Sequence, residues 1–378
     1  MEVISQWLPN LHKLILALPG PPKRYEDASD EVRQSLLLSY PQGLAELGLS
    51  IEKIDDPYFV LPSDFVSDLC STLGRCCPGL QSLSFDRIRL GNNFLKMWSI
   101  LSASGIPRID CSFFFDWKES SSAGLSLSDW IQTPDCIRSL DLLTIGCDPF
   151  HQSAVNVSGC CNLETLTVWD WSFPGFALPK DLPAFPRLRF LRLQSTCTFL
   201  TRWDGLTDGG ELRVLQLFTG FNPPTLSTLR LVAAKNPYLT EICWFHSSPS
   251  SEAKNLLVGL ASVSSLRKLT LGLLDWNGNA IGSVLALVEP HRWISPVETM
   301  KLQLRIGKVV DSFFSVLSSF YPNLKYLELE LHTNERDAGT LASAVPSILR
   351  LPFLETFAVR SSPSNELEKL NFTLSTAK

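Results

Sequence analysis

Histidine and cysteine are the residues of this sequence that could supply a general base, a nucleophile or a metal ligand. The five histidines are His12, His151, His246, His291 and His332. The ten cysteines include the adjacent pairs Cys76-Cys77 and Cys160-Cys161. Zinc sites usually combine two thiolate pairs of C-x2-4-C spacing, and neither adjacent pair has such a partner pair. We therefore expect no metal site and interpret these cysteines as small buried residues that precede strands.

Motifs that would indicate catalysis are missing. The sequence has no G-x-x-x-x-G-K-S/T loop for phosphate, no G-x-G-x-x-G after a strand, no H-E-x-x-H and no G-x-S-x-G. We expect this chain to have no catalytic residues, no cofactor and no enzymatic activity of its own.

Charge and composition exclude several other classes of protein. The chain has 378 residues, 45% hydrophobic and 19% charged, which is typical of a folded protein and not of a disordered one. The net charge of -5, without a long basic run, disfavours capture of nucleic acid or of an anionic membrane. The N-terminus lacks a signal-peptide pattern, and no apolar run reaches the roughly 18 residues that span a bilayer. We expect an intracellular protein of the cytoplasm or nucleus, with reduced cysteines.

A repeated hexapeptide of the form L-x-x-L-x-L indicates the strands of the fold that positions the histidines and cysteines. It begins at Leu11, Leu44, Leu80, Ile106, Ile137, Leu163, Leu188, Leu212, Leu239, Leu266, Val297, Leu324 and Leu354. The copies follow one another every 24 to 36 residues, about 29 on average. This interval lies at the long end of the range of leucine-rich repeats.

We therefore predict an α/β fold in which residues 1–378 form one leucine-rich-repeat solenoid of about 13 units, a horseshoe with a C-terminal cap over 360–378. Parallel strands would line the concave face and helices the convex face. Residues far apart in sequence stay far apart in such a stack, so the five histidines are not expected to form a catalytic triad.

Local signals between the hexapeptides support this assignment. Proline precedes several of them, as in Asn236-Pro237-Tyr238-Leu239, and proline ends a helix and starts an extended segment. The four-residue spacing of Phe65, Leu69 and Leu73 predicts a helix, and so does the apolar stripe between Val309 and Phe320.

The residues that point away from the core are expected two, four and six positions after the first residue of each hexapeptide. On units six to nine these positions bring together aromatic residues and one arginine, a composition typical of protein-binding hot spots. The predicted binding residues are Trp169, Phe190, Arg192, Phe218 and Phe245.

A second interpretation of these aromatics stays open, namely that a loop of the same chain, Phe113–Trp117 or Trp169–Phe173, covers them. The same outward positions also carry charge. Asp110 and Asp141 are expected side by side, Lys268 and Lys301 on neighbouring strands, and Glu328 and Glu330 on one strand. We interpret these charges as a solvated rim.

Some hexapeptides are preceded by Cys-Pro or Phe-Pro, as at Cys77-Pro78 and Phe185-Pro186, and the units are rich in aromatic residues. In these features and in the repeat length, the sequence resembles the leucine-rich-repeat regions of F-box proteins, especially the divergent sets of mushroom-forming fungi. The resemblance covers nearly the whole chain. It implies that the repeats hold a substrate protein, while an N-terminal F-box docks the Skp adaptor of a cullin-RING ubiquitin ligase.

This sequence departs from that pattern because only ten residues precede Leu11, where a three-helix F-box would have to fit. Skp and cullin are therefore expected as partners only if an F-box exists outside this chain. Either the sequence is part of a longer protein, or it is a relative that has lost adaptor binding. We predict a protein-binding module, with a free-standing scaffold or inhibitor and a nucleic-acid-binding solenoid as the alternatives.

Overall fold

The computed structural model describes residues 11–18, 40–51, 60–61, 63–90, 94–116, 137–145, 162–170, 186–195, 210–219, 226–248, 257–276, 294–306, 311–332, 351–361 and 369–373. These residues belong to two compact units, which are described one at a time. The first contains residues 1–190 and 194–208, and the second contains residues 191–193 and 209–378. The prediction of one domain over 1–378 stays a prediction.

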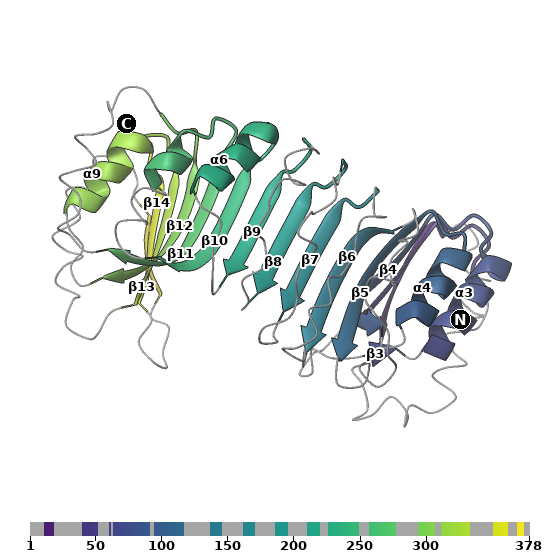
Figure 1. Ribbon diagram of the computed structural model, residues 1–378. Helices are drawn as coiled ribbons and strands as arrows, with labels where there is room; N and C mark the ends of the chain where they lie inside the picture. Colours follow the sequence, from purple (N-terminus) through teal and green to yellow (C-terminus); the bar gives the residue numbers. More distant parts are fainter. Residues whose placement is uncertain are drawn as a thin grey trace. The chain divides into compact units, whose positions relative to one another are not determined.

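The first unit is a stack of strands that add to the sheet in the order of the sequence (Figure 1). Its strands are β1 (Lys13–Leu18), β2 (Glu46–Ile51), β3 (Val60–Leu61), β4 (Ser82–Leu90), β5 (Arg108–Asp116), β6 (Ile137–Ile145) and β7 (Thr165–Asp170). Neighbouring strands are parallel, and the short β3 pairs with β4 beside this path. Two helices, α3 (Ser63–Cys76) and α4 (Phe94–Ala103), lie next to each other in this unit (Figure 1).

The second unit has the same construction. Its strands are β9 (Val214–Thr219), β10 (Glu241–Ser248), β11 (Lys268–Trp276), β12 (Thr299–Ile306), β13 (Tyr326–His332), β14 (Thr356–Ser361) and β15 (Lys369–Thr373). Its helices are α6 (Leu226–Lys235) and α9 (Asp311–Phe320). Strand β8 (Phe190–Ser195) contributes Leu191–Leu193 to the second unit and its other residues to the first.

Every predicted hexapeptide coincides with a strand, and thirteen strands run parallel in sequence order: β1, β2 and β4 to β14. Strand β15 pairs antiparallel with β14, in the segment where the sequence predicts a cap. Only some strands are followed by a described helix, so the number of complete strand-plus-helix units and the convex placement of the helices stay predictions. The described strands establish a solenoid of stacked coils.

The apolar positions of the hexapeptide form the core, as the pattern predicts. Leu239, just before β10, is buried, as are Ile242 and Trp244 within it; the equivalent buried residues of the β12 hexapeptide are Val297, Met300 and Leu302. Parallel register places equivalent residues side by side, such as Ile242 next to Leu269, so each apolar position extends as a ladder from strand to strand. The core therefore lengthens along one direction without thickening.

The two predicted apolar stripes are confirmed as helices. Phe65, Leu69 and Leu73 lie on α3 and are fully buried. On α9, Phe314, Leu317 and Phe320 are buried. Tyr321, the residue after α9, donates a hydrogen bond from its hydroxyl to the carbonyl of Leu257 and is also buried, which ties the end of this helix to the segment that precedes β11.

Candidate functional site

The outward positions of the strands form the face on which a partner can be held. In β8 these positions are Phe190, Arg192 and Gln194, and all three are half-buried, whereas Leu191 and Leu193 between them are buried. The same alternation recurs along the described strands, because successive side chains of a strand point to opposite faces of the sheet. The sequence therefore identifies the solvent-facing side of the sheet correctly.

Three of the predicted binding residues meet in the second unit. The rings of Phe218 on β9 and Phe245 on β10 stack with their centroids 4.7 Å apart and their planes 7° from parallel. The guanidinium carbon of Arg192 lies over the Phe218 ring, 4.8 Å from its centroid. Arg192, Phe218 and Phe245 thus form one column that crosses neighbouring strands, which we call the aromatic column.

A glycine lies next to Phe245, on the strand that follows the aromatic column. Gly272 on β11 is the register partner of Phe245. A Cβ atom on Gly272 would lie only 1.9 Å from Cδ1 of Phe245, so the ring occupies the space that any other side chain would need. Gly272 therefore allows Phe245 to lean onto β11 while it stacks on Phe218. Sequence reasoning missed this residue, although it stands at the same hexapeptide position as both phenylalanines.

The orientation of the rings determines what they offer to solvent. They face each other across the sheet, at about the separation of neighbouring strands, so their rims and not their faces point outward. The rim of an aromatic ring carries partial positive charge, whereas its face carries partial negative charge. An aromatic or carbonyl group of a partner would therefore meet the rims favourably.

Ion pairs lie on the strands beside the aromatic column. Lys268 Nζ contacts both carboxylate oxygens of Glu241 at 3.0 Å. Lys301 Nζ lies 3.0 Å from Oε2 of Glu328, and the hydroxyl of Tyr326 donates to the same oxygen at 2.8 Å. These charges of the predicted rim are thus organised into ion pairs across neighbouring strands.

In both pairs the lysine side chain is more exposed than the glutamate side chain. The side chains of Lys268 and Lys301 are 43% and 42% exposed, whereas those of Glu241 and Glu328 are 20% and 7% exposed. Although each pair is neutral overall, a partner would meet the lysines first.

Cys243 lies among these charges, at an outward position of β10, but it is buried. Burial raises the pKa of its thiol to about 12, and the charge of Glu241 adds to this shift, while Arg192 and Lys268 oppose it. The thiol is therefore protonated near neutral pH and packs as a small apolar group.

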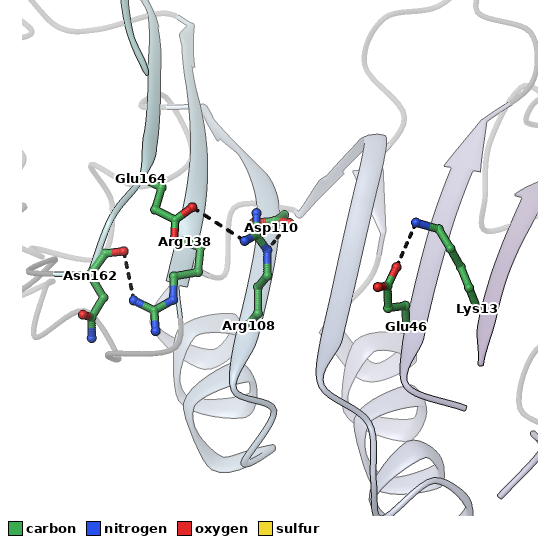
Figure 2. A network of polar contacts seen from close by, with 7 residues as sticks. All are labelled: Lys13, Glu46, Arg108, Asp110, Arg138, Asn162 and Glu164. Atoms are coloured by element: carbon green, nitrogen blue, oxygen red, sulfur yellow. Dashed lines mark hydrogen bonds and ion pairs between the residues drawn. The ribbon is translucent and has the colours of Figure 1, made fainter. Parts of the chain in front are cut away.

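The strands of the first unit and the residues just before them carry a different set of contacts (Figure 2). Arg108 Nε donates to Oδ2 of Asp110 at 3.0 Å, and its Nη1 lies 3.7 Å from Oε2 of Glu164. Lys13 pairs with Glu46 at 2.8 Å, and Arg138 donates to the backbone carbonyl of Asn162 at 3.1 Å. These contacts join strands through polar groups and include no described aromatic ring.

The expected juxtaposition of Asp110 and Asp141 is wrong. Strands β5 and β6 do not pair in the register of the uniform repeat: past an irregularity between Ile109 and Asp110, Asp110 lies opposite Ser139 and Asp141 lies opposite Ser112. The hydroxyl of Ser112 donates to Asp141 at 3.2 Å. The shift separates two carboxylates that the uniform repeat would have placed next to each other.

The other predicted binding residues are not joined to the aromatic column by any described contact. Phe190 is half-buried and belongs to the first unit. The backbone of Trp169 lies in β7, opposite Leu143, but its side chain lies outside the described part of the structure. The covering loops considered as an alternative, Phe113–Trp117 and Trp169–Phe173, involve side chains that also lie outside it. The roles of Trp169 and Phe190 in binding stay predictions.

The described part of the chain contains no group of three or more histidine, cysteine, aspartate or glutamate side chains arranged to hold a metal ion. The cysteines described there are free thiols, and Cys77 donates to the carbonyl of Pro41 at 3.3 Å. None of the described helices has both the length and the apolar character needed to cross a lipid bilayer.

Comparison with known proteins finds a likeness among solved structures. No protein-family model and no curated protein match this chain. Among solved structures, it is similar to the leucine-rich repeat-containing protein LegL7 from Legionella pneumophila, at 14% sequence identity and a TM-score of 0.36. The match covers 90% of this chain and 97% of the other.

Proposed function

We propose that this chain is a protein-binding module that holds its partner on the outward face of the sheet, with the aromatic column at the centre of the contact. The aromatic column carries this proposal. Stacked rings with an arginine bury a large area at a small cost in side-chain entropy, and such residues dominate the binding free energy of protein interfaces. Solenoids of stacked strands also offer extended faces that are used for binding.

The test is affinity capture of partners from a lysate of the source cells, with mass spectrometry, comparing the wild type with Phe218→Ala/Phe245→Ala. We expect one set of partners to be captured by the wild type and lost from the double variant. The matched control is Phe353→Ala/Tyr238→Ala, which removes two exposed aromatic rings from turns before strands. Equal capture by the wild type and Phe218→Ala/Phe245→Ala would contradict the proposal.

The narrower proposal is substrate recognition in an F-box-type ubiquitin ligase. It rests on the resemblance of the repeats, and it predicts Skp and cullin among the partners of the full-length protein. Capture of one abundant protein without Skp or cullin would favour the alternative, a free-standing scaffold or inhibitor. Capture of RNA that is lost steeply with added salt would favour nucleic-acid binding.

The proposal assigns no reaction and no cofactor to this chain. The most shifted thiol on the outward face, that of Cys243, is held in the protonated form, which is the unreactive one. The proposed function of the chain is to bind a protein inside the cell, in the cytoplasm or nucleus.

A further inference from the structure

We infer that the second unit binds an acidic segment of its partner, which places an aromatic or aliphatic side chain on the rims of Phe218 and Phe245 and a carboxylate on Lys268 or Lys301. This inference rests on the proposed function and specifies the chemistry of the partner.

The argument for acidity begins with the charges at the described outward positions of β8 to β13. They are the cations Arg192, Lys268 and Lys301 and the carboxylates Glu241, Glu328 and Glu330. The formal sum is zero, so charge counting from the sequence favours no partner. Exposure makes the two signs unequal, because the side chains of Glu241 and Glu328 are less exposed than those of their lysines, while Glu330 accepts a hydrogen bond from Nε2 of Gln303 at 2.8 Å. The positive ends are what an approaching segment meets.

The aromatic column adds to the preference for an acidic partner segment. Its outward rims carry partial positive charge, and the guanidinium of Arg192 lies over the Phe218 ring at one end. A basic side chain approaching this surface would be repelled by Arg192 and the two lysines. A carboxylate, a carbonyl group or the face of an aromatic ring would be attracted.

Strand geometry sets the spacing within the partner. On β11, Lys268 stands four residues before Gly272, which lies beside the aromatic column, and Lys301 lies opposite Thr270, two residues before Gly272. A strand advances about 3.3 Å per residue, so the lysines stand about 7 to 13 Å from the column along the strand direction. An extended partner segment that follows the strands would thus carry its acidic residue two to four positions from its aromatic one.

The first experiment is selection of a random dodecapeptide library displayed on phage, using the wild-type protein, followed by removal of clones that still bind Phe218→Ala/Phe245→Ala. We expect the column-dependent clones to share an acidic residue two to four positions from an aromatic or aliphatic one. Column-dependent clones that are neutral or basic would overturn this inference and leave the proposed function standing. The absence of any column-dependent clone would contradict both.

The second experiment measures how the enriched peptide binds variants in which the ion pair is changed from either side. We expect Lys268→Gln to weaken binding about threefold to fivefold at low salt, and Glu241→Gln to strengthen it by a similar factor, because the uncovered lysine then faces the peptide alone. If the ion pair between Lys268 and Glu241 only stabilised the fold, the two substitutions would not change the affinity in opposite directions.

The matched control is the ion pair between Lys325 and Glu298, in which Nζ lies 2.8 Å from Oε2. Each of these residues precedes the first outward position of its strand. We expect Lys325→Gln and Glu298→Gln to leave affinity within twofold of the wild type. The same direction of change from Lys268→Gln and Glu241→Gln, or equal effects at the control pair, would overturn the inference.

Discussion

Phe218 and Phe245 stack at 4.7 Å on neighbouring parallel strands, each the register partner of the other. The ring separation is close to the spacing of strands in a sheet, so backbone pairing itself brings the rings into contact. The relationship depends on what stands on the next strand, because Phe245 also leans over Gly272.

Gly272→Ala is predicted to displace the Phe245 ring, because the new methyl group would stand 1.9 Å from Cδ1 of that ring. Overpacking of this kind costs about 1 to 3 kcal/mol. We expect a lower free energy of unfolding and weaker partner binding, measured by urea denaturation and by affinity capture. Gly79→Ala is the control, since nothing lies within 4 Å of the position its Cβ would take. A Gly272→Ala protein as stable as Gly79→Ala would refute the packing argument.

The alternation of core and surface along β9 predicts opposite outcomes for neighbouring residues. Leu215 is fully buried, whereas Gln216, the next residue, is half-buried on the outward face. Leu215→Ala should lower the free energy of unfolding by about 2 to 5 kcal/mol, because it leaves a cavity between the coils. Gln216→Ala should change it by less than about 0.5 kcal/mol. Similar losses in both variants would show that the assignment of the two faces is wrong.

Much of this division of faces is predictable from the sequence, because it depends only on the period of the hexapeptide. Buried Leu239, Ile242 and Trp244 follow from their positions in the pattern. The separation of Asp110 from Asp141 could not be predicted, since the shifted register between β5 and β6 leaves no signal in the apolar pattern. The ion pair between Glu328 and Lys301 was also not predicted. The pattern of apolar and polar residues indicates which face of the sheet a side chain points to, but not which neighbouring side chains it contacts.

Asn236 is predicted to be a structural residue that joins one coil to the preceding one. It is buried at the end of α6, where its Nδ2 donates to the carbonyl of Val232 at 2.8 Å and its Oδ1 accepts from the backbone N–H of Leu212 at 3.2 Å. Asn236→Ala removes the acceptor of a buried N–H, so we expect a loss of about 1 to 3 kcal/mol in the free energy of unfolding.

Gln81→Ala serves as the control for that measurement, because Gln81 is exposed and its Nε2 donates to the nearby carbonyl of Gly79 at 3.3 Å. Partner binding to both variants should match the wild type at temperatures where they remain folded. Selective loss of binding by Asn236→Ala without loss of stability would contradict a purely structural role.

The buried thiols predict that stability falls in alkaline solution. Burial raises the pKa of Cys243 to about 12 in the folded protein, from an ordinary value of 9.0 in an exposed chain. As pH rises above 9, the unfolded chain loses this proton first, which favours unfolding until the folded thiol also ionises near pH 12. Stability from this group is therefore complete below pH 9 and is lost between these two values. Burial raises the pKa of Cys70 and Cys77 in the same direction.

Cys243→Ala should consequently show a shallower loss of stability between pH 9 and pH 11 than the wild type, because one of the thiols that drive this loss is gone. The measurement is the free energy of unfolding in urea, under reducing conditions, at several pH values across this range. Gln216→Ala, which changes a neighbouring outward position without removing a thiol, should keep the wild-type slope. Parallel curves for Cys243→Ala and Gln216→Ala would mean that the Cys243 thiol ionises as readily in the folded protein as in the unfolded chain, contrary to its burial.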